Sequence, residues 1–232
     1  MLVEGIVGMH TPRLRMLITS LSLVICGFLA SCGALSGGVL ATTKAAFQFG
    51  SAPADTASLN PSVRYLRVMI DGRVALLVLG YTDFDRLGPV EVWYSADRTV
   101  LRLQNGHVVG LTGTNTEWRQ ARLSAMPQWP TATAASEPTI YTRMRDVMPG
   151  YRFGVQDSLS LRAISPPAKS NLAVLKATDL RWFEAVEKNA KLPAARFALT
   201  GSDQGNFVVY SEQCISSALC LSWQQWPAVL QP

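Results

Sequence analysis

The sequence predicts an all-β fold, in which an antiparallel meander of strands curls into a barrel-like domain. From residue 63 onward, short runs rich in β-branched and aromatic residues alternate with turn dipeptides, which is typical of antiparallel strands. The dipeptides include Asp71-Gly72, Asn105-Gly106 and Pro149-Gly150. Nearly every run is joined to the next by a short connection, and an up-and-down sheet of that length tends to curl on itself.

The first predicted strands, at 64–70 and 74–79, flank Asp71-Gly72, the strongest short hairpin signal. The second run is uniformly apolar, so we expect it to lie centrally or to be covered on its far side by another layer. Further strands are predicted at 90–94, 99–103, 107–111 and 116–123. The first two of these are joined at Ala96-Asp97-Arg98, and the second and third at Asn105-Gly106.

The second part of the chain continues the same pattern. Strands are predicted at 141–145 and 151–155, around Pro149-Gly150, and then at 158–164, 194–200, 206–211 and 219–223. A five-residue loop, 201–205, joins two of them. The segment 179–188 fits a helix capped by Thr178 or Asp179 as well as a strand, and we favour the strand because its neighbours are strands.

The N-terminal residues predict a lipoprotein signal peptide. Arg13 and Arg15 precede an almost uncharged apolar run, 16–30, which is shorter than the about 20 residues needed to cross a membrane. Leu29-Ala30-Ser31-Cys32 resembles a lipobox, in which small residues fit the peptidase cleft and the cysteine thiol accepts lipid. We therefore expect removal of residues 1–31 and acylation of Cys32. The alternative is an ordinary secretory signal with a chance cysteine.

Acyl chains on Cys32 would hold the protein at a membrane, since each buried methylene contributes about 0.8 kcal/mol. Gly33 follows the cysteine, whereas an Asp there is the usual signal for retention in the inner membrane. The predicted location is therefore the periplasmic face of the outer membrane. Residues 32–60, rich in Ala, Ser, Thr and Gly, predict a flexible tether. Residues 61–232 form the predicted domain, with candidate halves at 61–126 and 139–232.

Charge and cysteine content narrow the function further. The formal net charge of +5 at pH 7 comes without any run of Lys or Arg, so we expect no nucleic-acid partner. Cys26 would leave with the signal and Cys32 would carry lipid, so Cys214 and Cys220 are expected to form a disulfide in an oxidising compartment. The alternative, a redox-active or metal-binding pair, is disfavoured because His107 would be the only histidine left.

No pattern indicates catalysis, a cofactor or a metal site. Gly201-Ser-Asp-Gln-Gly205 misplaces the serine of a hydrolase elbow and is expected to be a turn. Carboxylate pairs such as Asp83/Asp85 and Glu184/Glu187 occur in any sequence, so they do not by themselves indicate the two catalytic carboxylates of a glycoside hydrolase. His107, beside a predicted turn, is expected on the surface. We predict no catalytic residue, no cofactor and no metal ligand.

The aromatic content is consistent with saccharide binding, because aromatic rings present flat apolar faces to sugar C–H groups while nearby polar side chains bind the hydroxyls. Candidate ligand-binding residues are Trp93, Tyr94, Trp118 and Arg102. Trp93 and Tyr94 are adjacent on a predicted strand and must face opposite sides. At least one of them is therefore expected in the core.

Several stretches carry a resemblance to a known family: 65–81, 92–110 with Val92-Trp-Tyr-Ser-Ala-Asp97, Trp118, and Pro149-Gly-Tyr-Arg-Phe-Gly154. They resemble the YjbF/GfcB lipoproteins, encoded with exopolysaccharide and group 4 capsule secretion genes. The likeness covers residues 60–165 well and the C-terminal third loosely. One departure is Asp97-Arg98, where glycine would suit a tight turn. Arg98 at positive φ would be strained, so we expect a wider turn there.

This resemblance implies a β-barrel lipoprotein on the periplasmic side of the outer membrane, and it supplies no catalytic residue. We predict a non-enzymatic accessory in exopolysaccharide or capsule export, which binds glycan or an export protein and is held to the membrane through Cys32. A first alternative is a carrier that encloses a lipid or lipid-linked sugar, which needs a wide apolar cavity. A second is an enzyme acting on cell-wall glycan, which needs two converging carboxylates of shifted pKa.

Overall fold

The computed structural model describes residues 59–228, apart from 128, 130–136, 190 and 203–204. The lipobox, Cys32 and nearly all of the predicted tether lie outside the described residues. The cleavage, the acylation and the tether therefore stay predictions. In the part of the chain that the structure describes, no helix has the length and apolar character needed to cross a membrane.

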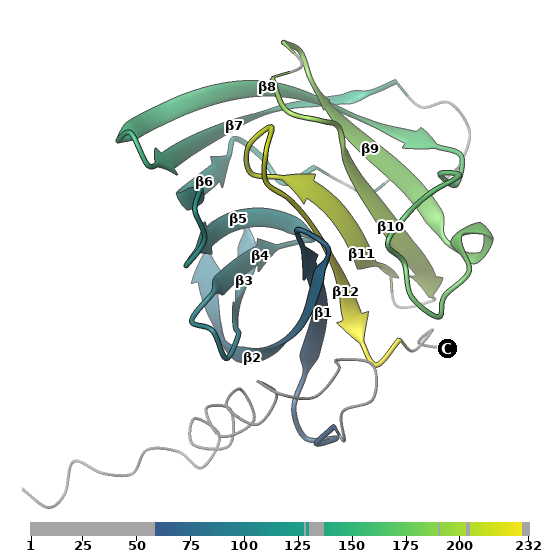
Figure 1. Ribbon diagram of the computed structural model, residues 1–232. Coiled ribbons are helices and arrows are strands. Elements are labelled where there is room, and N and C mark those ends of the chain that lie inside the picture. Colours follow the sequence, from purple (N-terminus) through teal and green to yellow (C-terminus); the bar gives the residue numbers. More distant parts are fainter. Residues whose placement is uncertain (1–58, 128, 130–136, 190, 203–204, 229–232) are drawn as a thin grey trace, which may run out of the picture. The chain divides into compact units, whose positions relative to one another are not determined.

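Twelve antiparallel strands follow the order of the chain around one closed barrel, in which β12 pairs with β1 (Figure 1). This confirms the predicted all-β meander. Strands from 61–126 and from 139–232 belong to the same closed sheet. The strands are β1 (Tyr65–Ile70), β2 (Arg73–Asp85), β3 (Gly88–Tyr94), β4 (Val100–Gln104), β5 (His107–Thr112), β6 (Glu117–Leu123), β7 (Thr139–Met148), β8 (Arg152–Ile164), β9 (Arg181–Glu187), β10 (Ala195–Ser202), β11 (Gly205–Cys214) and β12 (Cys220–Trp226).

Two of the predicted turns have the backbone that their residues favour. Asp71 and Gly72 between β1 and β2, and Asn105 and Gly106 between β4 and β5, all have positive φ, from 46° to 85°. A two-residue turn of this type needs positive φ at both positions, which Asn, Asp and Gly adopt most readily. The sequence therefore places these turns correctly.

The turn between β3 and β4 is wider than two residues, as expected. Arg98 nevertheless has the positive φ that the wider turn was expected to avoid. The Ser95 N–H donates to the Thr99 carbonyl at 3.0 Å, which leaves three residues between them. Arg98, the last of the three, has a φ of 71°. Three-residue hairpin loops commonly end with one residue in the left-handed region, so the expectation for Arg98 is wrong.

Two predicted boundaries are also wrong, while the choice of a strand at 179–188 is confirmed as β9. The runs at 151–155 and 158–164 form one strand, β8, because backbone pairing with β7 continues through Gln156, Asp157 and Ser158. The predicted five-residue loop at 201–205 is shorter, since β10 and β11 remain paired as far as Ser202 and Gly205. Polar residues do not end a strand when their backbone groups remain paired with the neighbouring strand.

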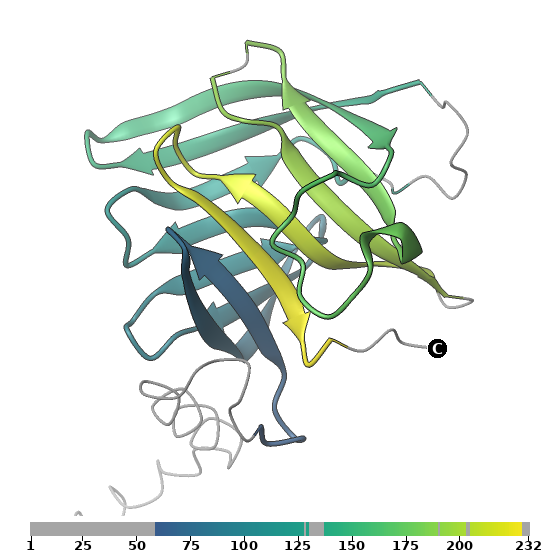
Figure 2. The same ribbon diagram turned by 45° about the vertical axis from the view of Figure 1, so that its right-hand side comes forward.

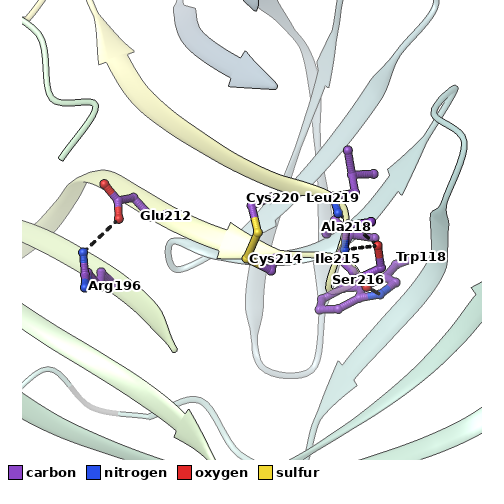
Figure 3. Close-up of a disulfide and its surroundings, with 9 residues drawn as sticks. All are labelled: Trp118, Arg196, Glu212, Cys214, Ile215, Ser216, Ala218, Leu219 and Cys220. Atoms are coloured by element: carbon purple, nitrogen blue, oxygen red, sulfur yellow. Dashed lines mark hydrogen bonds and ion pairs between the residues drawn. A yellow bond between two sulfur atoms is a disulfide. The ribbon is translucent and has the colours of Figure 1, made fainter. Parts of the chain in front are cut away.

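Large side chains fill the barrel interior. Trp93, Trp118, Phe183 and Phe197 are each at most 2% exposed and belong to one core cluster. The turn between β11 and β12 folds inward, so that Ile215 is buried in the same cluster and its carbonyl accepts a hydrogen bond from the Trp118 indole at 2.9 Å (Figure 3).

The predicted disulfide is confirmed at this turn. Cys214 and Cys220 are bonded across the directly paired ends of β11 and β12 (Figure 3). The bond therefore closes the short segment that carries Ile215 into the core.

Two smaller apolar clusters lie outside the barrel wall. The connection between β8 and β9, which includes the 3₁₀ helix η2 (Ala177–Asp179), runs across the outside of the sheet (Figure 2). Its apolar residues pack against Trp182 and Tyr210. In the second cluster, Val78 of β2 packs against Leu59, Val63 and Trp226. The apolar strand β2 is thus covered on its far side, as its sequence predicts.

Candidate functional site

The structure divides the four predicted ligand-binding residues into two groups. Trp93 and Trp118 face the barrel interior and are 1% and 0% exposed, so both are core residues. Tyr94 and Arg102 face outward on neighbouring strands, β3 and β4. Trp93 and Tyr94 therefore point to opposite sides, as adjacent strand residues must. Only Tyr94 and Arg102 are placed where a ligand in solvent can reach them.

A β-bulge adds Tyr81 to this outward-facing pair. In the pairing of β2 with β3, Leu79 lies opposite Trp93 and Tyr81 lies opposite Val92, so Gly80 is the extra residue. The bulge shifts the alternation and directs Tyr81 outward, where it is 52% exposed. Its ring centroid lies 6.4 Å from that of Tyr94. A Cβ at Gly80 would collide with the Tyr94 ring, so glycine permits this close approach.

Arg102 and Asp83 complete the cluster. Their nearest side-chain atoms, Nη2 and Oδ2, are 3.6 Å apart. The aliphatic part of Arg102 runs along Gly110, where an added Cβ would lie 3.0 Å from Arg102 Cδ. The Nε of Arg102 is buried and has no acceptor among the described residues. We refer to Tyr81, Asp83, Tyr94 and Arg102 as the outer site.

A groove of about 210 Å³ adjoins the outer site. It lies beside β5 and β6, which share only one paired position, Leu111 opposite Trp118. Phe84, at its edge, is 84% exposed. The charged and amide side chains that line the groove are Asp83, Asp85, Arg86, Arg102, Gln104, Gln120 and Arg122. Arginines outnumber carboxylates here, which favours an anionic or polyhydroxylated ligand.

The carboxyl groups with shifted pKa do not form a catalytic acid. The backbone N–H of Leu87, together with the charges of Arg86 and Arg122, holds the pKa of Asp85 below its usual value. Although burial raises the pKa of Asp97, hydrogen bonds from Ser95 and Thr99 outweigh it and lower the value. A glycosidase acid needs a raised pKa instead. Within the described segments, no group of three His, Cys, Asp or Glu side chains is arranged to hold a metal ion.

Arg143, Arg145 and Asp157 form a buried charge cluster that was not predicted from the sequence. Arg145 Nη2 lies 2.7 Å from Asp157 Oδ1, and Arg143 Nε lies 3.0 Å from Asp157 Oδ2. Both guanidinium groups lie over the Trp118 ring, at 4.5 and 5.0 Å from its centroid. Burial alone would raise the pKa of Asp157, but the two arginines outweigh it and lower the value. The available signal was the two-residue spacing of the arginines, which places both on one face of a strand.

His107 is buried, so the expected surface position is wrong. It is 4% exposed, stacks with Trp129 at a centroid distance of 5.5 Å and contacts Phe197 at 4.7 Å. The neighbouring turn is packed against β11, since a Cβ at Gly106 would meet Val208 at 2.7 Å. Burial and the nearby charge of Arg143 lower the pKa of His107 to about 3. The imidazole is therefore neutral near pH 7.

The comparison with family models agrees with the resemblance seen in the sequence. A family model described as "Group 4 capsule polysaccharide lipoprotein gfcB, YjbF" matches residues 48–220. A solved structure of the hypothetical lipoprotein YmcC from Escherichia coli K12 is similar, with 16% identity, a TM-score of 0.49, and coverage of 75% of this chain and 85% of that one. The comparison with curated proteins finds no match. The chain therefore belongs to the YjbF/GfcB family of group 4 capsule polysaccharide lipoproteins.

Proposed function

We propose that this protein is a non-enzymatic accessory in the export or assembly of capsule or exopolysaccharide, and that it binds glycan at the outer site. Acylated Cys32 would hold it on the periplasmic face of the outer membrane. The observation that carries the proposal is the gathering of two tyrosine rings, Arg102 and Asp83 on one outward face, beside a groove lined with further arginines. Membership of a capsule polysaccharide lipoprotein family supports the same role.

The chemistry of the outer site suits an acidic polysaccharide. Tyr81 and Tyr94 offer ring faces to sugar C–H groups, and Arg102 offers a guanidinium that is partly exposed. Leaving the Arg102 Nε donor without an acceptor costs about 1–3 kcal/mol, which a carboxylate or hydroxyl oxygen of a ligand would offset. Arg86 and Arg122 extend this positive character along the groove.

Binding at the outer surface is favoured over enclosure in the barrel. The interior is occupied by Trp93, Trp118, Phe183 and Phe197, which argues against a carrier of lipid or lipid-linked sugar. The downward pKa shift of Asp85 argues against a glycosidase acid in the groove. An export protein remains the other partner class, and it predicts that the purified protein binds neither polysaccharide in the experiment below.

The test is binding of the purified protein to immobilised polygalacturonate, an acidic polysaccharide, and to dextran, a neutral one. Arg102→Gln is expected to weaken binding to polygalacturonate about ten-fold or more, because it removes charge-assisted hydrogen bonds. Arg162→Gln is the matched control, since Arg162 also pairs with a carboxylate, Glu184, on the surface of neighbouring strands. Equal binding by both variants, or no binding by the unaltered protein, would exclude the outer site as a glycan site.

The membrane anchor has a separate test. Cells grown with radioactive palmitate are expected to label the unaltered chain and not a Cys32→Ser variant. The labelled protein should sediment with the outer membrane in a density gradient. An unlabelled, soluble product would refute the proposed location, and unchanged surface polysaccharide after deletion of the gene would refute the proposed role.

A further inference from the structure

We propose that the mouth of the barrel is a second saccharide site, which takes one sugar ring of the same glycan. This inference rests on the proposed function and assigns it a further contact. The mouth is the end of the barrel at which a cleft of about 320 Å³ opens. It is lined, among others, by Arg64, Glu91, Asn206, Phe207, Trp223 and Gln225. Its volume is at the small end of the range for ligand pockets, which suits one sugar ring.

One residue that lines this cleft, Trp223, has an indole donor without an acceptor in the described part of the chain. Trp223 lines the cleft and is 3% exposed, and no described residue accepts a hydrogen bond from its Nε1. The indole groups of Trp118, Trp129 and Trp182 donate to Ile215, Asn105 and Ala177 respectively. The Trp93 indole also has no acceptor among the described residues, but Trp93 does not line the cleft. Buried donors in folded proteins nearly always have an acceptor. A sugar hydroxyl or ring oxygen would supply one for Trp223.

The rim of the cleft carries groups that bind hydroxyls. Arg64 Nη2 and Glu91 Oε1 are 2.6 Å apart, and their side chains are 55% and 30% exposed. An exposed ion pair of this kind contributes little to stability, so a ligand can share its donors and acceptor at low cost. Phe207, 42% exposed, adds an apolar face from β11. Together these groups provide the mixture of ring face and polar atoms that a saccharide requires.

The mouth and the outer site share one hairpin. Pro89 and Glu91 of β3 line the mouth cleft, whereas Asp83 and Val90 of the same β2–β3 hairpin line the outer groove. This follows from the alternation of side chains along a strand. A polysaccharide that crosses the hairpin would therefore meet both sites.

The test follows the indole N–H signal of Trp223 by ¹H–¹⁵N NMR of the full chain in a phosphocholine detergent, which carries no sugar. Methyl glycosides of glucose, galactose and glucuronic acid are the probes. At least one is expected to shift the Trp223 signal in a saturable way. The Trp182 signal, from an indole bonded to Ala177 under the β8–β9 connection, should not move.

Two variants separate this inference from the proposed function. Glu91→Gln, at the exposed rim, is expected to weaken the glycoside effect about five-fold, the value of one hydrogen bond. Arg102→Gln, at the outer site, should leave the effect unchanged. Octanoate, which has an apolar chain and no sugar ring, is the control probe. A Trp223 signal that no glycoside moves, or one that moves with octanoate alone, would overturn the saccharide assignment of the mouth. Loss of polygalacturonate binding in Arg102→Gln would still uphold the outer site.

Discussion

Replacement of Asp157 by asparagine tests whether the buried charge cluster holds β7 and β8 together inside the barrel. Asparagine has nearly the same size, so the change removes the negative charge and creates no cavity. Asp157 has no exposed side-chain surface, and the side chains of Arg143 and Arg145 are 10% and 7% exposed. The variant therefore leaves two buried guanidinium groups over Trp118 without the carboxylate that they share.

The expected loss of unfolding free energy is about 3–5 kcal/mol, the usual cost of removing one partner from a buried ion pair. That loss is a large part of the about 5–15 kcal/mol by which a domain is stable. The matched control is Asp83→Asn, whose carboxylate is 56% exposed and 3.6 Å from Arg102. Exposed pairs contribute about 0–1 kcal/mol, so this control should remain near the parent protein.

Urea unfolding followed by tryptophan fluorescence measures both variants, because the cluster lies against the Trp118 ring. A third protein replaces Arg143 and Arg145 by Met and Asp157 by Leu, and it should recover most of the loss, since apolar groups of similar volume often replace a buried ion cluster without cost. A change below about 1 kcal/mol in Asp157→Asn would refute the argument that this buried charge is required.

Two further predictions concern stability. The unfolded state binds a proton at His107 below pH 6.5, whereas the folded state resists protonation down to about pH 3, so stability falls as the pH falls through this window. The loss between pH 7 and pH 5 is about 2 kcal/mol, and His107→Phe should abolish it. Replacing Cys214 and Cys220 together by serine should cost about 2 kcal/mol, the entropy of the short loop that the disulfide closes.

Both predictions have internal checks. The pH dependence is measured by urea unfolding of parent and variant at matched ionic strength, and parallel profiles would show that another group titrates. For the cysteine pair, the reduced parent protein should match the double serine variant. If reduction left the urea midpoint unchanged, the disulfide would have no part in stabilising the turn that carries Ile215.

The sequence by itself determined the order of strands, most of the turns and the disulfide, because these depend on neighbouring residues. Asp71-Gly72 and Asn105-Gly106 favour positive φ wherever the chain runs, and Cys214 and Cys220 are only six residues apart. Alternation along β3 was also sufficient to separate Trp93 from Tyr94. The sequence also identified two of the four residues of the outer site, Tyr94 and Arg102.

Only the tertiary structure decided which polar residues are buried and which side chains meet. A bulge at Gly80 turned Tyr81 toward Tyr94, and one extra residue reverses every later side chain of a strand. Closure of the barrel brought Trp118 to Ile215, which lies 97 residues later, and the register of β7 with β8 placed Asp157 beside Arg143 and Arg145. Such contacts depend on register and closure around the whole sheet, which no local pattern of residues specifies.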